Sequence, residues 1–209
     1  MTNYLLSTAY LPPLSYYAIL NANPSVSIEF FEHFEKQTFR NRCHIYSPNG
    51  RQSLVVPLIK RSERTPTKEV KISYTEAWQK QHWRSIEAAY RRSPYFEYFE
   101  DHFAPIYSSP KHTYLIDLNM ELLALVNRLF KITCQLIPTA HYEAFPPNIL
   151  DYRKVFNPEP IALTLDTYPI YAQVFDLKYG FIPELSVLDL LFNEGPKGID
   201  VLNKLFTTS

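Results

Sequence analysis

The sequence predicts an α/β fold, in which a mixed sheet opens with a βαβ unit and a helical segment packs on it. Three observations support this fold class. A strand–turn–helix–strand pattern fills the first 34 residues, apolar residues recur at helical spacing between about 75 and 130, and 46% of the 209 residues are hydrophobic. The alternative is an α+β arrangement, with a hairpin-rich sheet and a separate helical subdomain. We expect one domain to span residues 1–209.

The N-terminal elements follow one another closely. Residues 4–10 predict a short strand that ends before Pro12 and Pro13, and residues 14–22 predict a short helix. Residues 25–34 alternate apolar and polar side chains, which indicates a second strand. A helix between two strands is typical of a βαβ unit.

A hairpin and several helices are predicted next. The turn sequence Ser47-Pro-Asn-Gly50 separates two strand-like runs and predicts a hairpin over residues 38–59. Ser73, Ser93 and Asp117 each stand where an N-cap residue would begin a helix.

The C-terminal third is less regular. Residues 136–160 are rich in proline and tyrosine and indicate irregular structure, followed by short strands predicted at 163–165 and 172–175. Ser186 predicts another N-cap, and residues 199–206 predict a final helix.

The composition narrows the classes of function. Lys plus Arg and Asp plus Glu both number 21, so no net charge draws the chain to nucleic acid or to an anionic membrane. No apolar run approaches the ~20 residues that cross a bilayer, and the N-terminus lacks the basic residues of a signal peptide. We therefore expect a cytoplasmic protein without membrane insertion. The sequence contains no Walker A, GxGxxG, GxSxG, HExxH or CxxC motif, and it indicates no metal site and no particular cofactor.

The basic run Lys36-Gln-Thr-Phe-Arg-Asn-Arg-Cys-His44 is the most function-like segment. If the run is one strand, every second side chain lies on one face, because side chains of a strand alternate. Arg40 and Arg42 would then offer several donors to a phosphate or carboxylate. The same pattern also fits a solvent-exposed strand face, or an edge strand whose charged side chains prevent aggregation. Cys43 would lie on the opposite face as a buried thiol.

Two further pairs have spacing that suits a site. Trp78 and His82 lie one helical turn apart, so His82 would be an acid–base group beside an aromatic wall, or a half-buried histidine bonded to backbone. Asp189 and Asn193 also lie one turn apart. They would point into a site together, or Asp189 would cap its own helix and Asn193 would end it.

Six segments, in this order along the chain, resemble the WbqC-like protein family of bacteria. They are Ala9-Tyr-Leu-Pro-Pro-Leu-Ser-Tyr-Tyr17, Lys36-Gln-Thr-Phe-Arg-Asn-Arg42, Leu54-Val-Val-Pro57, Trp78 with His82, Ser93-Pro-Tyr-Phe96 and Leu188-Asp-Leu-Leu-Phe-Asn193. The first segment departs from the Gln-Pro start that is common in the family. The resemblance implies a role in surface polysaccharide (O-antigen-like) biosynthesis, through modification of an activated amino sugar. It also makes the Arg-Asn-Arg of the basic run the leading site candidate.

Two functions remain open. An enzyme that acts on a nucleotide-activated sugar, or on a similar phosphate-bearing metabolite, would use His82 and Asp189 as catalytic residues. Its substrate-binding residues would be Tyr10, Tyr17, Lys36, Arg40, Asn41, Arg42, Trp78 and Asn193. A non-catalytic binding or scaffold protein in polysaccharide assembly would instead bury His82 with its hydrogen bonds made. The enzyme hypothesis expects Arg40, Arg42, His82 and Asp189 to converge on one pocket. The sequence indicates no oligomeric state.

Overall fold

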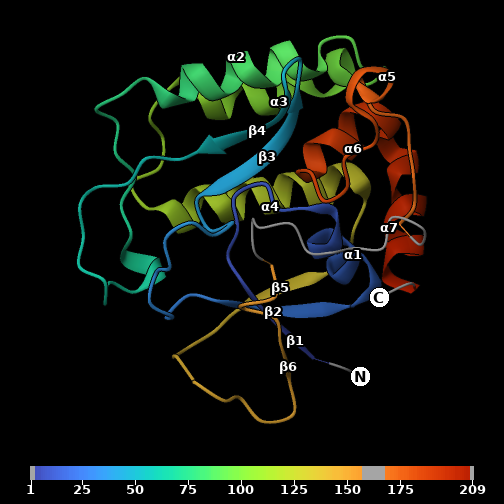
Figure 1. Cartoon of the computed structure of the whole chain (residues 1–209). Helices are drawn as coiled ribbons and strands as arrows, with labels where there is room; N and C mark the ends of the chain where they lie inside the picture. Colours follow the sequence, from blue (N-terminus) through green and yellow to red (C-terminus); the bar gives the residue numbers. More distant parts are fainter. Residues whose placement is uncertain (1–2, 157–167, 208–209) are drawn as a thin grey trace.

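The computed structural model describes residues 3–156 and 168–207. Four parallel strands form one sheet in the order β5-β2-β1-β6. A separate hairpin and a set of helices lie beside this sheet (Figure 1). The strands of the sheet are β1 (Tyr4–Ser7), β2 (Ser25–Glu29), β5 (Gln135–Pro138) and β6 (Leu150–Asp151).

The predicted α/β fold is confirmed, and so is its βαβ opening. Helix α1 (Leu14–Ala22) connects β1 to β2, and the two strands pair in parallel, with Ser7 opposite Glu29. The sheet is more uniform than expected, because its antiparallel hairpin is separate from it rather than part of one mixed sheet.

The predicted hairpin is also confirmed. Strands β3 (Arg42–Ser47) and β4 (Gly50–Val55) pair antiparallel, and Ser47 lies opposite Gly50 across the turn. Gly50 has a φ of +91°, a backbone conformation that glycine adopts without a steric cost. Glycine at this position therefore suits the turn that closes the hairpin.

The prediction that Lys36 to His44 forms one strand is wrong. Strand β3 begins only at Arg42, and residues 36–41 form turns and bends, with Gln37 at a φ of +60°. The segment is bound to other elements instead of a neighbouring strand. The backbone oxygen of Phe39 accepts from the Tyr10 amide, and that of Arg40 accepts from the Asn119 side chain. The alternation argument therefore does not apply before Arg42.

Three helices fill most of the segment predicted to be helical, namely α2 (Trp78–Tyr90), α3 (Phe96–Ser108) and α4 (Leu115–Phe130). Their predicted N-caps at Ser73, Ser93 and Asp117 are wrong. The helices begin after Ala77, Tyr95 and Tyr114, none of which makes a side-chain cap hydrogen bond.

Local contacts explain two of these errors. The Ser93 hydroxyl donates to the backbone oxygen of Tyr90, so it closes the end of α2 instead of opening α3. Asp117 lies inside the first turn of α4, where a carboxylate is favourable near the positive end of the helix dipole.

The C-terminal region contains short helices and a connecting segment. Its described helices are α5 (Asp176–Tyr179), α6 (Val187–Glu194) and α7 (Gly198–Thr207). The described residues also form two short 3-10 turns, η1 (Thr67–Glu69) and η2 (Gly195–Lys197). The Ser186 cap is confirmed, because its hydroxyl accepts from the Leu188 amide. The strand predicted at 172–175 is absent, and the one predicted at 163–165 lies outside the described residues.

The core lies between these layers. In Figure 1, α4 runs between the hairpin and the four-stranded sheet, and α2 lies on the far side of the hairpin. Helix α4 buries a stripe of apolar residues that includes Leu118, Leu122 and Leu125. In the described part of the chain, no helix is long and apolar enough to cross a membrane.

Candidate functional site at the carboxyl edge of the parallel sheet

The carboxyl ends of the parallel strands carry polar side chains. Ser7 ends β1, Glu29 ends β2, Asp151 ends β6, and Thr139 follows β5. Because the strands are parallel, these ends meet at one edge of the sheet. Strand β2, the next strand along the chain, pairs with one edge of β1, and β6 pairs with the other edge of β1. Ligands of open α/β sheets bind beside such a change of direction, outside the carboxyl ends of the strands.

Arg40 forms the first half of a charged network at this edge. Its Nε and Nη2 atoms donate to the two carboxylate oxygens of Glu32, at 2.9 and 2.7 Å. Nη2 also donates to the Ser7 hydroxyl at 3.0 Å, and Nη1 lies 3.5 Å from a carboxylate oxygen of Glu35. Arg40 is only 3% exposed. Bidentate pairing of this kind fixes the guanidinium in one orientation.

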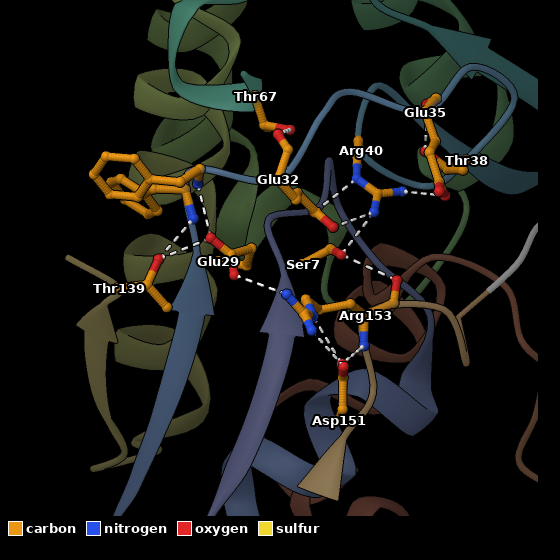
Figure 2. Close-up of polar contacts among 12 residues, drawn as sticks. Ser7, Glu29, Glu32, Glu35, Thr38, Arg40, Thr67, Thr139, Asp151 and Arg153 are labelled. Atoms are coloured by element: carbon orange, nitrogen blue, oxygen red, sulfur yellow. Dashed lines mark hydrogen bonds and ion pairs between the residues drawn. The ribbon is translucent and has the colours of Figure 1, made fainter. Parts of the chain in front are cut away.

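Arg153 forms the second half (Figure 2). Its Nε and Nη2 atoms donate to Asp151 at 2.9 and 2.5 Å, and its Nη1 donates to Glu29 at 3.1 Å. The Ser7 hydroxyl donates to the backbone oxygen of Arg153 at 3.0 Å, so Ser7 joins the two halves. Hydrogen bonds from Arg153 lower the pKa of Asp151.

The network contains more acids than bases. Its acids are Glu29, Glu32, Glu35 and Asp151, and its bases are Arg40 and Arg153. Among the described residues, this network therefore contains two more carboxyl groups than guanidinium groups. Both guanidiniums already donate to carboxylates, whereas the Glu35 side chain is half-exposed. The edge therefore suits hydroxyl or ammonium groups better than a phosphate.

A narrow crevice, with room for about one water molecule, opens between these groups. Its polar walls are Ser7, Thr8, Thr38, Arg40 and Arg153, and its other walls are Ala9, Tyr16, Phe39, Tyr152 and Phe156. Aromatic rings among donors and acceptors are the usual lining of a site for a polar small molecule with an apolar face.

The predicted residues Tyr10, Trp78 and His82 lie together, but inside the core. The Tyr10 hydroxyl lies 2.9 Å from Nδ1 of His82 and 2.7 Å from the Tyr107 hydroxyl. The rings of Trp78 and His82 meet edge to face at 5.0 Å. Burial lowers the pKa of His82 to about 4, against an opposing hydrogen bond with the Val55 backbone. His82 is therefore neutral at pH 7.

Asp189 lies in a second buried cluster. One of its carboxylate oxygens accepts from the Tyr171 hydroxyl at 2.6 Å and from the Gln173 side chain at 2.8 Å. Burial raises the pKa of Asp189 to about 6, although both hydrogen bonds favour the charged form. The Asn193 side chain donates to the Asp189 backbone oxygen, so it contacts the main chain of its own helix.

The remaining predicted residues lie in different surroundings. Asn41 is buried and its side chain donates to the Val56 backbone oxygen, and Tyr17 is fully buried. Lys36 is exposed in a shallow groove beside Phe34 and Arg61. Among the described residues, Arg40, His82 and Asp189 thus belong to three separate hydrogen-bond networks.

Sequence reasoning missed most of the network at the sheet edge. Ser7, Glu29, Glu32 and Arg153 were not selected, although Ser7 and Glu29 are polar residues that end buried strands. That position is the signal that would have found them. The described residues contain no group of three or more acidic, histidine or cysteine side chains suited to hold a metal ion.

The parallel sheet, the separate hairpin and the charged crevice define an α/β protein with a candidate small-molecule site at the sheet edge. The family model of the WbqC-like protein family matches residues 8–151, so the chain belongs to this family and the resemblance is confirmed. The chain is also 28% identical, over 222 aligned positions, to a Mycobacterium tuberculosis protein with the name "Uncharacterized protein Rv1507c". That alignment covers 95% of this chain and 96% of the relative. No solved structure gives a significant match.

Proposed function

We propose that this chain is an enzyme of bacterial surface polysaccharide biosynthesis that binds the sugar part of a nucleotide-activated sugar over the mouth of the crevice. The observation that carries the proposal is the position of the crevice, between β1 and β6 at the carboxyl edge of the sheet, with Ser7, Arg40 and Arg153 in its walls. The implied role of the WbqC-like family supports the same class of substrate.

The charges at the crevice favour an amino sugar. Half-exposed Glu35 and partly exposed Asp151, which bond to the two arginines of the crevice, keep part of their carboxylates accessible. An ammonium group would compensate the excess of negative charge, and sugar hydroxyls would bond to Ser7 and Thr38. Aromatic side chains such as Tyr152 and Phe156 would contact the apolar face of the ring.

A thermal-shift series tests the proposal. The ligands are nucleotide-sugars with a free amine, with an N-acetyl group and with hydroxyls only. We expect the amine-bearing ligand to raise the Tm of the wild-type chain most, because binding to the folded state stabilises it. Thr38→Trp covers the mouth of the crevice without removing an ion pair, and it should abolish this rise. Arg84→Gln, an exposed change on α2, is the control. A wild-type Tm that no nucleotide-sugar moves, or an equal rise in Thr38→Trp, contradicts the proposal.

A specific observation favours the non-catalytic alternative. His82 is 5% exposed, and its Nδ1 is already bonded to Tyr10. A buried histidine with its hydrogen bonds made is what the binding or scaffold hypothesis expects. Mass spectrometry of the nucleotide-sugar after incubation with the protein separates the two functions. A mass change that Thr38→Trp abolishes supports the enzyme. Tight binding without any mass change, across amine, acyl and phosphate donors, supports the binding protein.

A further inference from the structure

One face of the hairpin gathers basic side chains. Arg42 and His44 are two apart on β3, so they share a face. Tyr46, two residues after His44, is on the same face of β3. Arg51 of β4 pairs with Tyr46, and residues paired across an antiparallel ladder point to the same side, so Arg51 shares this face. Cys43, on the opposite face, is fully buried in the core.

The two arginines lie near the His44 ring. Burial, followed by the charges of Arg51 and Arg42, lowers the pKa of His44 to about 4. Such an effect requires both guanidiniums to lie close to the imidazole. Within residues 3–156 and 168–207, no carboxylate forms an ion pair with Arg42. Positive charge on this face is thus concentrated around a buried histidine.

Two buried polar atoms on this face lack a hydrogen-bond partner. They are Nε of Arg42 and Nδ1 of His44, and His44 is only 8% exposed. Buried polar atoms are nearly always bonded, so two such atoms on one face suit a position where a ligand or water binds. The Arg42 Nε–H only donates, and it requires an acceptor. An anionic oxygen would accept from Arg42 and from a protonated Nδ1 of His44.

Phe39 connects this face to the crevice. Phe39 lines the crevice, and its ring meets the His44 ring edge-on, with centroids 5.7 Å apart. We propose that Arg42, His44 and Arg51 form an anion subsite for the diphosphate of the nucleotide-sugar whose sugar ring lies over the mouth of the crevice. The identity of this ligand rests on the proposed function, whereas the recognition of a diphosphate anion does not.

Binding of inorganic pyrophosphate to the whole chain tests the subsite without a sugar. We expect calorimetry to show binding that weakens at least tenfold in Arg42→Gln and in Arg51→Gln, and that is unchanged in the matched charge removal Arg84→Gln. Pyrophosphate should also raise the pKa of His44 in an NMR titration, because a nearby anion stabilises the imidazolium. Arg51 is exposed, so if Arg42→Gln does not fold, the weaker pyrophosphate binding of Arg51→Gln tests the subsite.

The outcomes separate the two proposals. No pyrophosphate binding, an equal affinity in Arg42→Gln and Arg51→Gln, or an unmoved His44 titration overturns the subsite, even where nucleotide-sugars still raise the Tm. If Thr38→Trp binds pyrophosphate normally and nucleotide-sugars move no Tm, the subsite stands and the proposed function fails.

Discussion

Arg40 and Arg42 are two residues apart, yet they have opposite surroundings. Arg40 is buried, with both oxygens of Glu32 and the Ser7 hydroxyl as partners. Arg42 begins β3, and its Nε has no partner. Turns over residues 36–41 direct the first arginine to the sheet edge, and the strand directs the second to the hairpin face. The difference shows that two arginines of one compact basic motif can have opposite surroundings, one paired within the fold and the other with an unpartnered donor.

The largest expected effect is on the buried pair. Arg40→Ala would leave the Glu32 carboxylate buried without its partner, which costs about 3–5 kcal/mol of unfolding free energy. Urea denaturation measures this loss. Arg42→Ala is the comparison, and we expect it to cost under about 1 kcal/mol, because no ion pair is broken. Equal losses in the two variants would contradict the division of roles.

A smaller effect is expected at His44. Folding lowers its pKa from 6.5 to about 4, so below pH 6.5 the unfolded chain binds a proton that the folded chain does not. Its contribution is therefore present above pH 6.5 and is lost as the pH falls toward 4. After allowance for solvent screening we expect about 1–2 kcal/mol.

Denaturation of the wild type and of His44→Gln between pH 7.5 and 4.5, in phosphate-free buffer, measures this contribution. The pKa of His82 is also lowered by burial, but His82 is present in both proteins. Its contribution therefore cancels in the difference between their free energies of unfolding. The free energy of unfolding of the wild type, relative to that of His44→Gln, should decrease as the pH falls. Parallel curves would show that folding leaves the His44 titration unchanged.

The smallest effect is expected at Lys36. It belongs to the same basic run but is exposed, outside the crevice, so Lys36→Ala should change the free energy of unfolding by at most about 0.5 kcal/mol. Urea denaturation of Lys36→Ala and Arg40→Ala under the same conditions compares their losses of unfolding free energy directly. A loss above 1 kcal/mol would mean that stability depends on the charge of the run as a whole rather than on the buried pair.

Local signals account for the parts of the fold that the sequence predicts well. Pro13 stands directly before α1, whose predicted bounds are confirmed, and the Asn-Gly pair ending at Gly50 closes the hairpin. Strand β6 has two residues in a proline-rich segment, and it exists because Tyr4 and Leu5 pair with it. A pattern of neighbouring residues cannot predict a strand whose partner is so distant.

The candidate site shows the same limit. Arg40 was selected for its charge, but its bond to Glu32 depends on the turn between them, and the predicted strand does not contain that turn. Arg153 reaches Glu29 across 124 positions of sequence. Such pairs follow from the order of the strands, so they become visible only when the topology is known.

The pairing of β6 with β1 also constrains the order of events during synthesis. Tyr4 emerges from the ribosome early, whereas its partner Leu150 follows only after nearly 150 further residues. At about 5–20 residues per second, the edge of β1 waits roughly 7–30 s for this partner. An unpaired strand edge can recruit another chain. We expect the yield of folded protein to depend on chaperones during that interval, and to fall when translation pauses between α4 and β6.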